Sequence, residues 1–212
     1  TGIDIKGESK GLLPNPELFA RIRDAAESSA RVTHAHPLGV EGAVLVATAT
    51  AVVARAGSRM EVLRAASSVC EREEFTQRLA LAGTWLGSRD LPGPGEIRRR
   101  LGNGAAACES CVTALYAALR FQGSPFEEMM AFITALRGDV DTIGAMAGAL
   151  WGTARGASAL PEASLGKLED CDGRGRTARR LFERSATLTD PPGVSATGTC
   201  WPTQGPSAAT LR

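Results

Sequence analysis

Two carboxylates and a hydroxyl lie within four residues of one another in the second half of the chain. Asp139, Asp141 and Thr142 follow Gly138 and lead into an apolar, glycine-bearing segment. Hard cations such as Mg²⁺ prefer oxygen ligands of this kind, usually carboxylates completed by hydroxyls and water. The same pattern is typical of a helix N-terminus capped by an aspartate. Spacing alone favours the cap, and leaves a metal site as the second interpretation.

Cysteine and histidine provide weaker candidates. Cys108 and Cys111 form a C-x-x-C pair, which can bind zinc or run redox chemistry, but no second pair follows at ligand spacing. We therefore interpret both as small buried residues of a helix. His34 and His36 could form a metal pair, but without a third ligand a pocket or loop role is favoured. Five cysteines at irregular spacing predict a reducing intracellular compartment, by default the cytoplasm.

Helical periodicity covers most of the chain. Between a lead-in over 1–16 and a tail over 187–212, both expected to be disordered, apolar residues recur at three- and four-residue spacing. No segment shows the alternation typical of a strand. The sequence therefore predicts an all-α domain over 17–186. The expected helices cover 16–32, 40–56, 59–86 (one or two), 96–101, 105–121, 125–137, 141–156 and 161–183 (one or two).

Capping residues predict where two of these helices begin. Gly57 can end one helix, and Ser58 can cap the next. Ser124 as N-cap, Pro125 at the first helical position and Glu127 three residues after the cap match a capping box. We expect side-chain caps at both starts.

Glycine also recurs every four residues along the expected helix 141–156, at Gly144, Gly148 and Gly152. Each glycine weakens a helix by about 1 kcal/mol relative to alanine. Three on one face therefore predict that another backbone approaches this helix very closely. The large aromatic residues at helical positions are expected to be core rather than ligand platforms: Trp85, Tyr116 and Trp151.

The composition is that of a globular protein, with 43% hydrophobic and 22% charged residues and a net charge of +1. This balance gives no general attraction to nucleic acid or to an anionic membrane. The densest basic run, residues 98–100, is interpreted as a solvated helix face. The longest apolar run, residues 42–54, falls short of the roughly 20 residues that a membrane span needs. We expect neither nucleic-acid binding nor a membrane span.

Three segments resemble, in order and rough spacing, parts of the ADP-ribosylglycohydrolase family. Residues 137–156 (RGDVDTIGAMAGALWGTARG) resemble the signature in which a Gly-Asp-Thr-Asp-Thr turn opens a small-residue helix and binds paired magnesium ions. Residues 33–43 (THAHPLGVEGA) resemble a turn that enters a buried helix. Residues 101–116 (LGNGAAACESCVTALY) resemble a glycine-bearing helix start, most closely that of the member that removes ADP-ribose from serine.

This resemblance implies an orthogonal multi-helix bundle and a hydrolase. The reaction would remove ADP-ribose from modified proteins or other conjugates by Mg²⁺-assisted cleavage of the glycosidic bond. Its implied metal ligands are Asp139, Asp141 and Thr142, and its implied substrate-binding residues are His34 near the adenosine and Asn103, Gly104 and Ala105 beside the diphosphate-ribose. Backbone N–H groups at a helix start suit a diphosphate, and glycine permits close approach.

The chain also departs from the family pattern. Val140 replaces the middle threonine of the signature, which removes one hydrogen-bonding group, and Arg137 replaces the preceding glycine. The family's upstream Asp-Asp-Thr cluster and catalytic glutamate have no counterpart before His34; Asp24 and Glu27 fit a helix surface.

The chain therefore resembles roughly the C-terminal half of a family domain, and no catalytic residue is assigned. The alternative is a truncated or non-catalytic member that binds ADP-ribose weakly or acts as an interaction module. Half a domain would leave an apolar face uncovered, which predicts marginal stability or self-association.

Overall fold

The computed structural model describes residues 16–188, with side chains to residue 184. Within this range the regular structure is entirely helical, which confirms the predicted all-α class. The predicted lead-in and tail lie outside the described residues, except that Pro16 begins the first helix and residues 187–188 belong to the last. The chain divides into two compact units, Thr1–Ala154 and Arg155–Arg212.

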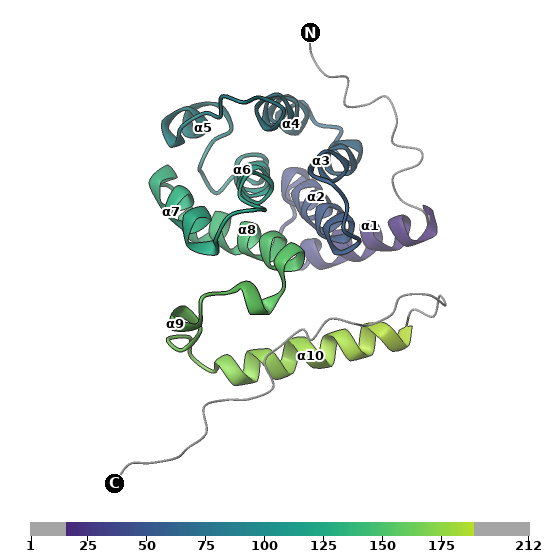
Figure 1. Ribbon diagram of the computed structural model, residues 1–212. Coiled ribbons are helices and arrows are strands. Elements are labelled where there is room, and N and C mark those ends of the chain that lie inside the picture. The colour runs from purple at the N-terminus through teal and green to yellow at the C-terminus, as the bar shows by residue number, and fades with distance from the viewer. Residues whose placement is uncertain (1–15, 189–212) are drawn as a thin grey trace. The chain divides into compact units, whose positions relative to one another are not determined.

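The first unit packs its helices around two central ones. α2 contacts α1, α3 and α6, while α6 also contacts α4 and α7 (Figure 1). The bounds are α1 Pro16–Arg31, α2 Pro37–Ala54, α3 Arg59–Ser68, α4 Glu73–Leu86, α5 Pro94–Arg100, α6 Ala107–Arg120, α7 Phe126–Leu136 and α8 Val140–Arg155.

The central position of α2 follows from its composition. It carries apolar residues around its whole circumference, which is typical of a helix that is covered on several sides. The helix begins at Pro37, so its apolar stretch is 18 residues rather than the expected 42–54. By length and composition α2 would also pass for a membrane span, but 44% of that stretch is buried inside the first unit. A core helix accounts for it.

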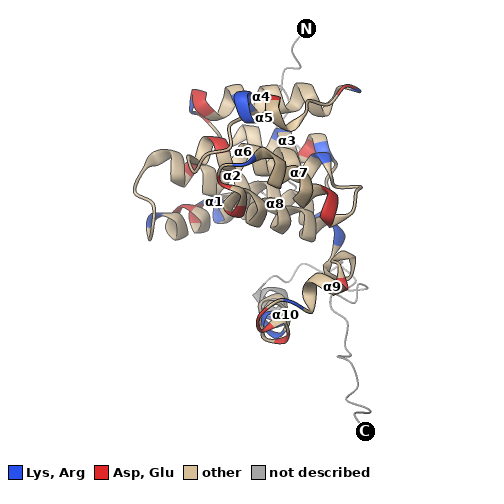
Figure 2. Cartoon of the chain, turned by 90° about the vertical axis from the view of Figure 1, so that its left-hand side faces the viewer, with Lys and Arg blue, Asp and Glu red and all other residues tan. Residues whose placement is uncertain are grey.

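The buried aromatic residues confirm the prediction that they belong to the core. Tyr116 and Trp151 are almost fully buried, and Trp85 packs edge-on against Tyr116 with ring centroids 5.9 Å apart. The indole N–H of Trp151 donates to the carbonyl oxygen of Phe121 at 3.1 Å. Basic and acidic residues both occur along the helices of the chain (Figure 2), in nearly equal numbers, 24 and 23.

The two predicted caps have different outcomes. Ser58 forms a complete capping box: its hydroxyl accepts from the N–H of Glu61, and its own N–H donates to the Glu61 carboxylate. The prediction for Ser124 is wrong, because α7 begins at Phe126 with Pro125 as N-cap and no side-chain cap. The backbone of Ser124 is part of the preceding turn, since its N–H donates to the Phe121 carbonyl at 3.0 Å, and its own carbonyl accepts from the Trp151 indole at 3.3 Å.

The expected close backbone approach at α8 is also wrong. A Cβ at Gly144 would meet the side chain of Met130 at 3.0 Å, and one at Gly148 would lie 3.6 Å from the Phe126 ring. A Cβ at Gly152 would meet nothing within 4 Å. Large side chains of α7, rather than a backbone, occupy the space that the first two glycines leave.

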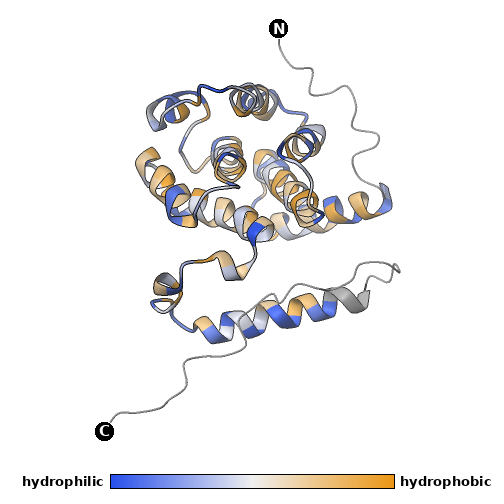
Figure 3. Ribbon diagram, in the orientation of Figure 1, coloured by the Kyte–Doolittle hydropathy of each residue, from blue (hydrophilic) through white to orange (hydrophobic). Residues whose placement is uncertain are grey.

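The second unit holds a short 3₁₀ helix, Ala157–Ala159, followed by α9 (Glu162–Leu165) and α10 (Cys171–Leu188). α10 is strongly polar, with apolar positions interspersed along it (Figure 3). Leu181 and Phe182 on this helix are more than half exposed.

Candidate functional site

A groove of about 810 Å³ lies between α1, α2, the start of α6 and the start of α8. Its size is within the usual range for small-molecule sites. Three of the predicted site residues line it, namely His34, Ala105 and Thr142. These residues come from three segments that are far apart in the sequence and that the fold brings to one cavity.

His34 lies in the turn between α1 and α2. Its Nδ1 is 2.8 Å from the Thr33 hydroxyl, and its side chain packs against Gly39, where a Cβ would approach to 3.0 Å. His36 also lines the groove and caps α2, since its Nδ1 accepts from the N–H of Leu38 at 3.2 Å. Within residues 16–188 no third His, Cys, Asp or Glu side chain gathers with this pair as a metal site requires, which favours the loop role over a metal pair.

The N-terminus of α6 opens directly onto the groove. Ala105, Ala106 and Ala107 line the groove, and Ala106 is an N-cap without a side-chain hydrogen bond. Among the described residues no protein acceptor takes the N–H of Ala105 or Ala106. Free N–H groups and the positive end of the helix dipole together favour an anionic ligand such as a diphosphate.

Asn103 and Gly104 lie just before this helix but outside the groove lining. The side-chain Nδ2 of Asn103 donates to the Leu136 carbonyl at 2.9 Å, and the N–H of Gly104 donates to the Glu109 carboxylate at 2.9 Å. Both residues are engaged with the protein itself. Their implied contact with substrate stays a prediction.

At the start of α8, the carboxylates of Asp139 and Asp141 converge. The Thr142 hydroxyl donates to Asp139 and is the main cause of its lowered pKa, to which the Asp141 side chain and the Thr142 N–H also contribute. These neighbours of Asp139 fit both the cap and the metal interpretation. Two carboxylates and one hydroxyl match the oxygen preference of Mg²⁺ but supply only part of its usual octahedral shell.

No third acidic group completes this cluster within residues 16–188, where no three His, Cys, Asp or Glu side chains gather as a metal would require. The set of protein ligands at α8 is thus partial. The turn that carries it is strained: Arg137 has φ 59° and ψ −165°, a backbone region used almost only by glycine. This is the position where the resemblance expects glycine.

Gly39 and Gly42 on α2 and Met146 on α8 also form parts of the groove wall. All three lie in segments that resemble the family, but the sequence analysis did not name them as site residues. Two small residues three apart on an apolar helix are the one pattern that could have indicated close packing there. Their neighbour Cys111 has a contact of 3.7 Å with the Met146 sulfur, and burial raises its pKa to about 11.

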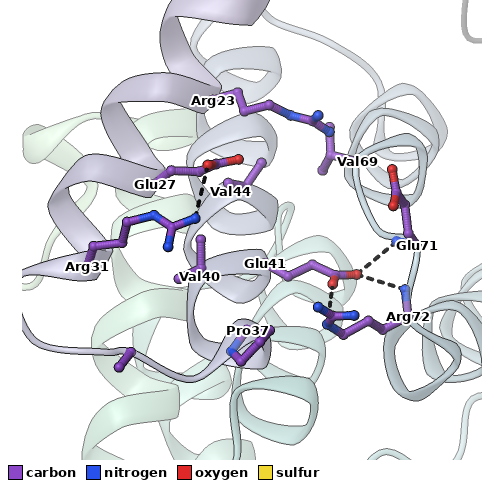
Figure 4. A pocket seen from close by; sticks show the side chains of 11 residues that line it. Arg23, Glu27, Arg31, Pro37, Val40, Glu41, Val44, Val69, Glu71 and Arg72 are labelled. Carbon is purple, nitrogen blue, oxygen red and sulfur yellow. Dashed lines mark hydrogen bonds and ion pairs between the residues drawn. The ribbon is translucent and has the colours of Figure 1, made fainter.

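A second pocket, of about 310 Å³, lies on another face of α2 and shares no lining residue with the groove (Figure 4). Its charged rim is largely paired internally. Glu41 accepts from the backbone N–H groups of Glu71 and Arg72 and pairs with the Arg72 guanidinium at 3.2 Å, while Arg31 lies 3.7 Å from Glu27. These contacts join α2 to the turn before α4, so this pocket has a structural explanation.

Comparisons with known proteins identify the family to which the chain is similar. A family model described as ADP-ribosylglycohydrolase matches residues 11–191. ADP-ribosylhydrolase ARH3 of Mus musculus is 29% identical over 196 residues, which is 78% of this chain and 53% of that protein. The Homo sapiens protein of the same name is 30% identical over 195 residues, covering 77% and 53%. An uncharacterized protein of Archaeoglobus fulgidus is 32% identical over 160 residues, covering 74% and 50%.

The chain spans about half the length of the curated relatives it matches. The matched region includes the turn at His34, the start of α6 and the start of α8. The family model covers well over half of the chain, and the all-α fold agrees with it. The chain belongs to the ADP-ribosylglycohydrolase family.

Proposed function

We propose that this chain binds the ADP-ribose moiety of modified proteins or other conjugates and contributes to Mg²⁺-assisted hydrolysis of the glycosidic bond. The observation that carries the proposal is the groove, which brings His34, Ala105 and Thr142 to one cavity. ADP-ribose has an apolar adenine, an anionic diphosphate and a ribose. The groove offers a small-residue wall, a helix N-terminus and an acidic cluster at its edge.

Each part of the groove has a role in this proposal. The free N–H groups at Ala105 and Ala106 would hold the diphosphate, and His34 would flank the adenosine. Asp139, Asp141 and Thr142 would hold Mg²⁺, which supplies positive charge near the ribose. The Asp139 carboxylate, whose ordinary pKa of 3.8 is lowered further, is ionised at neutral pH, as a metal ligand must be.

The alternative is a non-catalytic member that binds ADP-ribose without turnover. It is favoured by the incomplete carboxylate set within residues 16–188. The two functions share the groove and differ in the chemistry at its edge. Release of ADP-ribose from a serine-modified peptide, measured by mass spectrometry with and without Mg²⁺, separates them.

Binding itself is tested by titrating the chain with ADP-ribose, followed by amide chemical shifts in the presence and absence of Mg²⁺. We expect shifts at the start of α6 in both conditions, and tighter binding with Mg²⁺. Asp141→Ala should abolish the gain from Mg²⁺ and leave the Mg²⁺-free affinity unchanged.

Asp24→Ala is the matched control, because Asp24 is an exposed aspartate of α1 outside the groove lining. It should behave as the unaltered chain does. Absence of any shift at residues 105–107 with ADP-ribose in either condition would refute the proposed function. Equal affinity with and without Mg²⁺ would refute the metal site alone.

A further inference from the structure

Two segments of the site are joined through a single residue. The side-chain Nδ2 of Asn103 donates to the Leu136 carbonyl at 2.9 Å, across 33 residues of sequence. The backbone carbonyl of the same residue accepts from the N–H of Asp139 at 2.8 Å. Asn103 therefore bonds to both sides of the turn that leads from α7 into α8.

This turn also packs directly on Asn103. Gly138 has a φ of +71°, and a Cβ at this position would lie 2.6 Å from Nδ2 of Asn103 and in still closer contact with its carbonyl oxygen. Glycine is thus required at position 138 for two reasons, the left-handed backbone and the close approach. The loop before α6 and the turn before α8 fit against each other without a gap at this point.

The loop itself is held firmly on either side of Asn103. The Thr113 hydroxyl donates to the carbonyl of Gly102 at 2.8 Å, and the N–H of Gly104 donates to the Glu109 carboxylate at 2.9 Å. Thr113 is fully buried in α6. Because its neighbours are fixed to α6, Asn103 holds the turn between α7 and α8 at a fixed position relative to α6.

We propose that Asn103 is a positioning residue that fixes the acidic start of α8 relative to the anion-facing start of α6. Ala105 lies two residues after Asn103, and Asp139 is bonded to Asn103 directly. The groups proposed to hold metal and diphosphate are thereby kept in one rigid arrangement. The role in ligand binding rests on the proposed function, whereas the mechanical connection does not.

Amide hydrogen exchange tests the connection without any ligand. In Asn103→Ala the Asp139 amide and the first turn of α8 should exchange about tenfold faster, the effect of losing roughly one hydrogen bond. The buried amides of α2 and α6 should keep their protection. Gln77→Ala is the matched control, since Gln77 is an amide bonded only to Glu73 within its own helix, and it should leave Asp139 unchanged.

The reverse experiment alters the turn and observes the loop. Gly138→Ala should change the chemical shifts and speed the exchange of residues 103–107, because the added methyl group displaces Asn103. Gly123→Ala is its control, since a Cβ there meets nothing within 4 Å. Faster exchange throughout the protein in both Asn103→Ala and Gly138→Ala would indicate general destabilisation and overturn the proposal. Unchanged exchange at Asp139 in Asn103→Ala would do the same.

Titration with ADP-ribose then tests the consequence for binding. Asn103→Ala should lose most of the gain in affinity that Mg²⁺ gives, about tenfold, while its Mg²⁺-free affinity stays near that of the unaltered chain. An equal loss in both conditions would show that Asn103 contacts the ligand, and would overturn the positioning role. If the unaltered chain does not bind ADP-ribose, the proposed function fails while the exchange experiments still decide the mechanical connection.

Discussion

Gly42 of α2 and Cys111 of α6 are in contact where their helices cross beside the groove. A Cβ at Gly42 would lie 2.9 Å from the Cys111 sulfur and 3.0 Å from the Ala107 methyl group. All three residues line the groove, so this crossing sets the distance between two of its walls. Gly42→Ala should therefore force the helices apart and destabilise the protein by about 1–3 kcal/mol, measured by urea denaturation.

Gly152→Ala is the matched control for that substitution. Gly152 is also a helical glycine, but a Cβ there meets nothing within 4 Å. Alanine should then stabilise the protein by about 0.4–1 kcal/mol, because the unfolded chain loses conformational freedom. A Gly42→Ala variant as stable as the unaltered chain would show that the crossing can widen freely.

The reactivity of Cys111 should be low in the folded protein. Burial raises its pKa to about 11, so its thiol is protonated at neutral pH and is a poor nucleophile. Iodoacetamide at pH 8 should leave Cys111 unmodified in the native state and alkylate it in urea, as followed by mass spectrometry. Among the four cysteines within residues 16–188, Cys171, which is free and partly exposed, should react first. Rapid native alkylation of Cys111 would mean that this wall of the groove opens.

The capping box at the start of α3 should give an acid-dependent contribution to stability. Hydrogen bonds from the Ser58 side chain and backbone hold the pKa of Glu61 below its ordinary value of 4.5. A carboxyl group whose pKa is lower in the folded state stabilises the fold at pH values above its unfolded-state pKa. This stabilisation is lost as the pH falls through the pKa of the folded state. The difference in melting temperature between the unaltered chain and Glu61→Gln should therefore shrink below pH 4.5.

Ser58→Ala should destabilise the protein by about 1 kcal/mol near pH 7, the usual effect of losing an N-cap. Ser124→Ala is its control, because the structure shows no side-chain cap on α7. A loss of similar size at Ser124 would contradict this difference.

Arg137 has a backbone conformation that suits glycine, with φ 59° and ψ −165°. Such strain amounts to about 1–3 kcal/mol, and glycine loses about 0.5–1 kcal/mol more entropy on folding than alanine. Arg137→Gly should therefore stabilise the protein by about 1 kcal/mol net, visible as a higher melting temperature. Arg137→Ala keeps the Cβ and should give no such gain; equal gains would indicate that the side chain, not the backbone, is unfavourable.

Local patterns predicted most of the helices, because burial of one apolar face requires regular spacing. The Ser58 cap was also predictable, since its partner Glu61 lies three residues away. Ser124 carries the same local pattern and fails, because α7 begins one residue later than predicted, with Pro125 as N-cap, and Ser124 belongs to the preceding turn. The glycine face of α8 predicted a close backbone approach and this was wrong, because the sequence does not show that side chains of α7 lie beside Gly144 and Gly148.

For the candidate site too, local sequence predicted some features, whereas contacts between distant segments were not predictable. His34, Ala105 and Thr142 line one groove, whereas the other predicted site residues do not line it: Asn103, Gly104, Asp139 and Asp141. The tie from Asn103 to Leu136 and Asp139 spans more than thirty residues, and no spacing rule predicts it. A residue that bonds to two loops can be recognised only from a structure, which shows where the loops lie relative to each other.

The location of α2 between two separate cavities has a consequence for how the helix tolerates change. Pro37, Val40, Glu41 and Val44 border one cavity, whereas Gly39, Gly42, Ala43 and Val46 border the other. If every residue of α2 is substituted in turn, the sensitive positions should fall into two sets on different faces of the helix. Substitutions on both faces of α2 should change thermal stability, whereas only those on the face that borders the groove should change the affinity for ADP-ribose. One helix would therefore show two separate patterns of mutational sensitivity.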